Sequence, residues 1–262
     1  MDFQVVNYKI TQFIKEYVDS SRLQGLVVGL SGGIDSTVVA FAACQAIGNN
    51  KILGLLMPDI PSTTQQDMDD ALSICSILGI EHKLIGLNDI KEQFHKALEP
   101  TNNLLVTGNL SARIRMCIVY YYSALKNHLV AGTSNKTELS LGYFTKYGDG
   151  ASDILPIGGL YKTEVKEYAK FLNVPQNIVE KKSSARLWEN QITEDEIGLS
   201  FEQIDGILKF LDNTSNMSTD LTDLTCLYHQ FPTIPDYKIK NLLSLIKKNK
   251  HKLYFPPICR IN

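Results

Sequence analysis

The chain lacks the features that mark membrane, secreted and nucleic-acid-binding proteins. No apolar run approaches the roughly 20 residues that a transmembrane helix needs. The N-terminal segment is amphipathic and carries acidic residues, unlike a signal peptide. The 26 basic and 28 acidic residues leave a net charge of −2, which gives no electrostatic case for nucleic acid binding. We therefore expect no membrane and no nucleic acid among its partners.

Closely spaced cysteine pairs are also lacking. The five cysteines are odd in number and widely spaced, and none forms a CxxC motif. This spacing argues against a disulfide framework or a zinc site. Free cysteines behave as small apolar residues, so we expect reduced thiols that lie mostly in the core. Reduced thiols favour a cytoplasmic location.

Short apolar runs alternate with helical patterns along the first half of the chain. Strands are predicted at 26–30, 51–58, 82–87 and 129–133, and helices at 3–18, 36–47, 63–79, 88–98 and 108–128. Further helices are predicted at 162–173, 175–180, 200–212, 219–230 and 236–248. The alternation predicts an α/β fold: a Rossmann-like parallel β-sheet flanked by helices, with a helical C-terminal part. Since no linker interrupts the 262 residues, we expect 1–262 to form a single domain.

The segment SGGIDS, residues 31–36, lies between the first strand and the next helix. Gly32 and Gly33 let backbone N–H groups approach a ligand, and the helix N-terminus favours an anion. Asp35 would repel phosphate, but it suits a metal ion that bridges to phosphate oxygens. The segment is neither a Walker A loop, which needs a lysine after the glycines, nor a GxGxxG fingerprint. A tight turn capped by aspartate and serine is the alternative.

Four polar residues follow at places where a ligand can bind. Thr133, at the end of the fourth strand, contacts a nucleotide or caps the next helix. Glu138 supplies a second carboxylate to a metal at Asp35, or it lies in solvent. Arg113 and Arg115 are two apart and point to different faces of a helix. One suits a phosphate or carboxylate, and for Arg115 we favour a place at the edge of the core.

The glycine-rich stretch 143–161 has few regular signals. A loop this long is usually functional, and its Lys146, Asp149 and Asp153 either close over a ligand or lie in solvent. Lys162 begins the next helix, where the dipole disfavours a cation, and this favours an anion beside it. TEDE at 193–196 is typical of a helix start, and the basic cluster at 247–253 is typical of a solvated helix end.

These segments together resemble a known family. SGGIDS resembles the pyrophosphate loop of the N-type ATP pyrophosphatases, whose fold is adenine nucleotide alpha hydrolase-like. GNLSARIRM, AGTSNKTE and YFTKYGDGASDILPIGGLYKTEV resemble segments of the ammonia-dependent NAD synthetases, and the match runs from about residue 23 to about 253. The resemblance implies amidation of deamido-NAD to NAD, the last step of NAD biosynthesis. ATP is the co-substrate, an NAD-adenylate the intermediate, and AMP and pyrophosphate the by-products.

The resemblance also implies Mg²⁺, a homodimer and residue roles. ATP binding is implied for Gly29, Leu30, Ser31, Gly32, Gly33, Ile34, Asp35, Ser36, Thr133, Lys162 and Ser184. Deamido-NAD binding is implied for Arg113, Lys146, Asp153, His251 and Lys252. Asp35 and Glu138 are the implied Mg²⁺ ligands. Asp149 and Lys162 are the implied catalytic residues, with Asp149 orienting or deprotonating the ammonium.

The chain departs from the family pattern in one loop. Ser184 stands where a threonine is usual. The stretch 181–191 lacks the usual proline, and Arg186 lies where an acidic or small residue is common. The geometry of this loop is therefore open.

About 22 residues precede the match, so we expect no amidohydrolase domain and direct use of ammonia. A tRNA thiolase or lysidine synthase is disfavoured by the net charge and the missing CxxC, and GMP synthetase by the absence of its substrate loops. A non-catalytic nucleotide sensor would be expected to lose Asp35, Glu138, Lys146 or Lys162, and all four are present.

Overall fold

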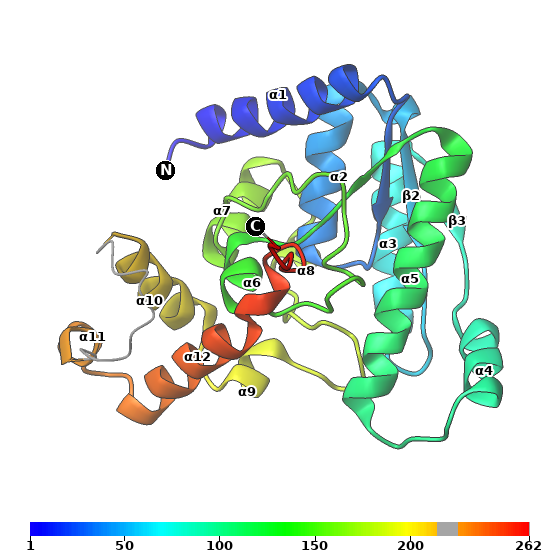
Figure 1. The fold of residues 1–262 in the computed structure, drawn as a ribbon. Helices are drawn as coiled ribbons and strands as arrows, with labels where there is room; N and C mark the ends of the chain where they lie inside the picture. The colour runs from blue at the N-terminus through cyan, green and yellow to red at the C-terminus, as the bar shows by residue number, and fades with distance from the viewer. Residues whose placement is uncertain (214–224, 262) are drawn as a thin grey trace.

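One parallel sheet organises the first half of the chain. The computed structural model describes residues 1–213 and 225–261 (Figure 1). The four strands are β1 (Leu26–Gly29), β2 (Ile52–Leu56), β3 (Glu81–Leu84) and β4 (Leu129–Ala131), in the order β3-β2-β1-β4. All neighbouring strands pair in parallel. The predicted parallel α/β fold is confirmed.

Helices cover both faces of this sheet. They are α1 (Phe3–Ser21), α2 (Ile34–Ile47), α3 (Gln65–Leu78), α4 (Asn88–Ala97) and α5 (Leu104–Lys126), with a short 3-10 turn η1 (Asn49–Lys51). Val28 packs in a cluster with α1 and α2, whereas Val27 packs with Val119 of α5. Alternate strand residues point to opposite faces, so β1 contributes to two cores. In Figure 1 the sheet stands between α2 and α5.

The second half of the described chain is helical, as predicted. It contains α6 (Lys136–Leu141), α7 (Lys162–Phe171), α8 (Gln176–Val179), α9 (Thr193–Ile197), α10 (Phe201–Asn213), α11 (Thr225–Gln230), α12 (Asp236–Asn249) and the turn η2 (Lys250–Lys252). α10, α11 and α12 share an apolar core with Leu141 and Tyr161 (lower left in Figure 1). Residues 219–224 of one predicted helix lie outside the described residues. The single domain stays a prediction.

Several local predictions need correction. α5 begins one turn early because the Asn103 side chain accepts the N–H groups of Leu105 and Val106. β4 ends at Ala131, two residues early, and β3 ends at 84. The five cysteines are free, but the expectation of mostly core thiols is wrong, because Cys117, Cys226 and Cys259 are exposed. None of the described helices is long and apolar enough to cross a bilayer.

The strand order creates a crevice at one edge of the sheet. After β1 the chain moves outward to β2 and β3, then returns to place β4 on the other side of β1. The connections that leave β1 and β4 therefore diverge. In open α/β sheets, ligands bind in the crevice at such a switch point. The SGGIDS segment follows β1, and Gly132 to Asn135 follow β4.

Candidate active site

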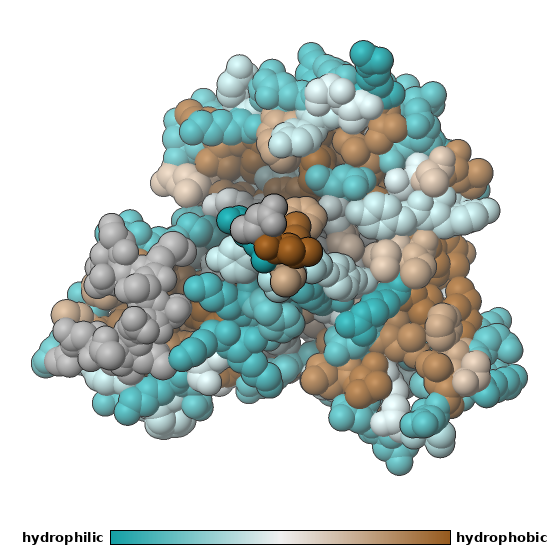
Figure 2. Space-filling model, in the orientation of Figure 1, coloured by the Kyte–Doolittle hydropathy of each residue, from teal (hydrophilic) through white to brown (hydrophobic). Residues whose placement is uncertain are grey.

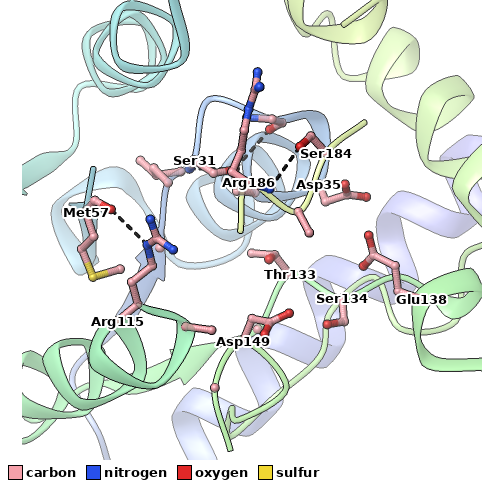
Figure 3. A pocket seen from close by; sticks show the side chains of 18 of the residues that line it. Ser31, Asp35, Met57, Arg115, Thr133, Ser134, Glu138, Asp149, Ser184 and Arg186 are labelled. Carbon is pink, nitrogen blue, oxygen red and sulfur yellow. Dashed lines mark hydrogen bonds between the residues drawn. The ribbon is translucent and has the colours of Figure 1, made fainter. Parts of the chain in front are cut away.

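A cavity of about 280 Å³ lies at the carboxyl ends of β1 and β4 (Figure 3). It is lined by twelve of the predicted site residues: Gly29, Leu30, Ser31, Gly33, Ile34, Asp35, Ser36, Thr133, Glu138, Asp149, Lys162 and Ser184. Gly32 belongs to the same loop but does not line the cavity. The structure thus brings together the predicted metal ligands, both predicted catalytic residues and nearly all of the predicted ATP-binding set.

The SGGIDS loop is held in shape by its own hydroxyl groups. The Ser31 and Ser36 hydroxyls lie 3.2 Å apart, Gly33 N–H donates to Ser31 Oγ at 3.3 Å, and Ser36 Oγ donates to the Gly33 carbonyl at 3.1 Å. Gly32 has a φ of +72°, and a Cβ there would lie 2.2 Å from the Asp67 carbonyl oxygen. Only glycine fits at this position. The loop therefore presents the N-terminus of α2 to the cavity, where an anion is favoured.

Three charged side chains meet beside this loop. Asp35 lies in the first turn of α2, Glu138 in the first turn of α6, and Lys162 at the first position of α7. Lys162 Nζ forms an ion pair with Asp35 Oδ2, and Asn135 Nδ2 donates to Asp35 Oδ1 at 2.9 Å. Glu138 accepts the Asn135 N–H at 3.2 Å as part of a capping box. The anion expected beside Lys162 is, in this structure, the Asp35 carboxylate.

Burial and mutual charge shift the pKa values of this group. Burial, and then the neighbouring Asp35 charge, raise the pKa of Glu138 to about 8. Burial disfavours the Lys162 ammonium, but Asp35 and Glu138 more than offset this and raise its pKa. The Lys162 side chain is only 2% exposed. The cluster thus holds the Lys162 ammonium beside the carboxyl groups of Asp35 and Glu138. A further cation at this place would be electrostatically favourable.

Asp149 faces the same cavity from the glycine-rich loop. Its Oδ1 accepts the Thr145 N–H at 2.9 Å, and burial raises its pKa. Gly150 packs against the Phe144 ring, and a Cβ there would lie 2.3 Å from a ring carbon. Figure 3 shows Asp149 across the cavity from the SGGIDS loop, close to Thr133 and Ser134. A carboxyl group so placed can accept a proton from a bound substrate.

Arg115 was expected at the edge of the core, and it is half-buried between residues of the core and the cavity. Its Nε donates to the Met57 carbonyl oxygen at 3.0 Å, and its guanidinium faces the cavity between Met57 and Asp149 (Figure 3). Burial lowers its pKa. Arg113, two residues away, is exposed and lies outside the cavity. Arg115 is three residues after Ala112 and four before Val119, both buried, so helical periodicity could have placed it inward.

The segment 181–187 covers the cavity near the SGGIDS loop. Lys181 Nζ lies 2.9 Å from Asp67 Oδ1 and donates to the Gly32 carbonyl at 3.0 Å. Arg186 binds the same Asp67 oxygen at 3.0 Å. Asp67 is 3% exposed, and the buried Asp70 carboxylate also pairs with Lys181, so two buried carboxylates of α3 hold this segment. Ser184 lines the cavity in the middle of the fastened segment.

The five residues predicted to bind deamido-NAD lie outside the cavity. Arg113 donates to the Lys146 carbonyl at 3.3 Å, and Lys146 Nζ donates to the His251 carbonyl at 2.9 Å. Lys252 Nζ donates to the Gly142 and Phe144 carbonyls, so the predicted solvated helix end is partly tied down. Asp153 is engaged elsewhere, with Val130 N–H at 2.7 Å and the Tyr120 hydroxyl at 3.2 Å. Hydrogen bonds thus link three of the five at a surface beside the cavity.

The amino-acid sequence is similar to those of known proteins. The NAD synthase family model matches residues 6–256. The NH(3)-dependent NAD(+) synthetase of Archaeoglobus fulgidus is 41% identical over 261 residues, covering 100% of this chain and 98% of that protein. That of Methanocaldococcus jannaschii is 44% identical over 257 residues, covering 97% and 95%.

Solved structures are similar along their whole length. The NH3-dependent NAD synthetase of Campylobacter jejuni, solved with nitrate, has a TM-score of 0.81 and 38% identity, covering 99% of this chain and 100% of that one. The NMN synthetase of Francisella tularensis has a TM-score of 0.86 and 32% identity, with 100% coverage of both chains.

Proposed function

The chain belongs to the NAD synthase family, and from this premise we propose that it is a ligase that converts deamido-NAD to NAD with ATP and ammonia. A nicotinate carboxylate oxygen attacks the α-phosphorus of ATP, the bond to the β-phosphate oxygen breaks, and pyrophosphate leaves. Ammonia then attacks the carbonyl carbon of the acyl adenylate. AMP departs with the former carboxylate oxygen, and the amide of NAD remains.

The observation that carries this proposal is the meeting of Asp35, Glu138 and Lys162 beside the SGGIDS loop, with Asp149 on the facing wall. The loop and the α2 N-terminus provide donors for a polyphosphate. Lys162 offsets the charge that develops as pyrophosphate leaves. Enclosure by the segment 181–187 keeps water from a mixed anhydride that water would hydrolyse.

The carboxylates of Asp35 and Glu138 fit Mg²⁺. No group of three His, Cys, Asp or Glu side chains in the described part of the chain makes a metal site from protein alone. Mg²⁺ is commonly held by one or two carboxylates together with substrate phosphates. Burial, and then the charge of Asp35, raise the pKa of Glu138, and a bound cation would favour its ionised form. Bound Mg²⁺ would neutralise phosphate charge, with Asp35 and Glu138 as its protein ligands.

Asp149 is suited to the second half-reaction. Ammonium must lose a proton before its nitrogen can attack, and a carboxylate in the cavity wall can orient the ammonium and accept that proton. The backbone N–H of Thr145 donates to Asp149 Oδ1 at 2.9 Å and holds this carboxyl group in the cavity wall. We assign Asp149 this role.

The rest of deamido-NAD would lie along the surface that joins Arg113, Lys146 and the His251–Lys252 turn, with Asp153 nearby. We infer a homodimer, since α5 and the segment before it carry several exposed apolar side chains. They are Leu98, Leu104, Leu105, Val106, Tyr121 and Leu125. On the side of α5, Figure 2 shows groups of brown residues among pale and teal ones. Exposed apolar patches of this kind mark protein interfaces. A cytoplasmic location is favoured by the five free cysteines.

Product analysis tests the proposed function. The purified chain is incubated with ATP, Mg²⁺, ammonium and deamido-NAD, and NAD, AMP and pyrophosphate are measured separately. We expect the three in equal amounts, and much slower NAD formation when glutamine replaces ammonium. Because an NMN synthetase shares the fold, the deamidated form of NMN is assayed in parallel as acceptor. Faster amidation of that mononucleotide would contradict deamido-NAD as the substrate.

A further inference from the structure

Asp205 is a buried carboxylate that lies outside the cavity and has no part in the chemistry described above. It belongs to α10, in the helical group that has its own apolar core, and is 2% exposed. A buried carboxylate is costly unless its oxygens are satisfied. Both Asp205 oxygens are satisfied, and both partners adjoin residues of the active site.

One Asp205 oxygen reaches α6 and the other reaches α7. Oδ1 accepts the hydroxyl of Thr137, the residue before Glu138. Oδ2 accepts the Thr163 N–H at 2.8 Å, and Thr163 is the residue after Lys162. The Thr137 hydroxyl in turn accepts the Lys162 N–H at 2.9 Å. A single carboxylate thus connects the backbone of Lys162 to the helix that carries Glu138.

The N-terminus of α7 depends on these contacts. Its N-cap residue, Tyr161, makes no side-chain cap hydrogen bond, and its first residue is a lysine, which the helix dipole disfavours. Glu164 in the first turn accepts the Tyr161 N–H at 3.0 Å, and Asp205 adds from another helix an acceptor for the Thr163 N–H. Phe201, also in α10, lies under the Lys162 ammonium, 5.6 Å from Nζ to the ring centroid.

We propose that Asp205 is a positioning residue, which holds the Lys162 ammonium in register with Asp35 and Glu138 by fixing Thr137 and the first turn of α7. The inference rests on the proposed role of Lys162 at the ATP phosphates. Without Asp205, α7 can shift or turn relative to α6. A displacement of about 1 Å at a reacting group is enough to slow a reaction by about 100-fold.

The test compares Asp205→Asn with Glu202→Gln, an exposed residue on the same helix that loses the same charge. Thr137→Val removes the hydroxyl that donates to Asp205 but keeps the shape of the side chain at position 137. ATP affinity is titrated without deamido-NAD or ammonium, and pyrophosphate release per folded molecule is measured well below the melting temperature. We expect Asp205→Asn and Thr137→Val each to weaken ATP binding and to lower kcat by about tenfold to 100-fold. The KM for deamido-NAD should change little, and Glu202→Gln should behave as wild type.

The double variant decides between positioning and a general loss of stability. Since both residues belong to one connected hydrogen-bond network, the loss of kcat in the double variant should be smaller than the product of the two single losses. A lowered melting temperature with unchanged kcat and ATP affinity per folded molecule would show that Asp205 serves the fold alone. If Asp205→Asn does not fold, Thr137→Val gives the same decision. Wild-type protein that binds ATP but makes no NAD would overturn the proposed function, while the comparison of ATP affinities would still test Asp205.

Discussion

Replacing Asp35 by asparagine separates its contribution to the fold from its contribution to the reaction. The variant keeps an oxygen for Asn135 but turns an amide group toward Lys162 Nζ. Removing one partner of a buried ion pair costs about 3–5 kcal/mol. Here the Asp35 side chain is 19% exposed, and Glu138 remains to balance Lys162. We therefore expect a smaller loss, about 1–3 kcal/mol of unfolding free energy, which corresponds to about 2–12 °C in melting temperature.

The expected effect on the reaction is much larger than this loss. A domain of ordinary stability, about 5–15 kcal/mol, stays folded after losing 1–3 kcal/mol. Removing one preorganised electrostatic contact at a reacting group commonly lowers kcat by about 10²–10³-fold, and Asp35 would hold both Mg²⁺ and Lys162. We expect at least this reduction in pyrophosphate release per folded molecule at 25 °C.

Asp59→Asn is the matched control. The Asp59 carboxylate is 2% exposed and pairs with Lys91 at 2.7 Å, yet Asp59 does not line the cavity. We expect it to destabilise the protein as much as Asp35→Asn or more, with pyrophosphate release within about threefold of wild type. Wild-type pyrophosphate release by Asp35→Asn, corrected for the folded fraction, would refute the assignment of Asp35.

Four further predictions follow from the same geometry. Asp149→Asn should release pyrophosphate but form little NAD, because the acyl adenylate keeps its AMP until ammonia attacks. Burial raises the pKa of Asp149 above its ordinary 3.8, so the native state keeps this proton at a higher pH than the unfolded chain does. The unfolding free energy of the wild type should therefore fall as the pH rises above 3.8. Urea titrations should show a less steep fall for the variant. Since the Arg115 guanidinium faces the cavity and can bind an anion there, Arg115→Met should weaken ATP binding about tenfold or more by calorimetry. Asp67→Asn should speed tryptic cleavage within 181–187. ATP should protect this segment from trypsin more strongly in the wild type than in the variant. Leu125→Glu should give monomers in sedimentation, whereas a wild-type monomer would contradict the dimer.

The sequence predicted those parts of the site that lie next to strand ends and helix starts. Asp35, Glu138 and Lys162 each occupy the first turn of a helix, where the dipole and the capping groups restrict what a charged residue can do. The parallel order of strands then places these turns at one edge of the sheet. Local pattern and topology together indicated where the SGGIDS loop lies, while the resemblance supplied the roles of Asp35 and Glu138.

The contacts between distant segments could not be predicted in the same way. Arg115 is held by a backbone carbonyl oxygen at Met57, which no side-chain pattern reveals. Asp67 meets Lys181 and Arg186 more than 100 residues along the chain, and Asp205 caps a helix in another part of the fold. Long cationic side chains reach many positions from a given backbone, so their partners depend on tertiary packing. Resemblance supplied Ser184 as a site residue, but not the carboxylates that hold its segment.

The transfer of labelled oxygen tests whether the nicotinate carboxylate is activated by adenylation. Deamido-NAD labelled with ¹⁸O in both oxygens of its nicotinate carboxylate is turned over to completion with ATP, Mg²⁺ and ammonium. Mass spectrometry then locates the label. The account predicts one labelled oxygen in the phosphate of AMP, one in the amide of NAD and none in pyrophosphate. Release of ADP and labelled inorganic phosphate, or AMP without label, would contradict it.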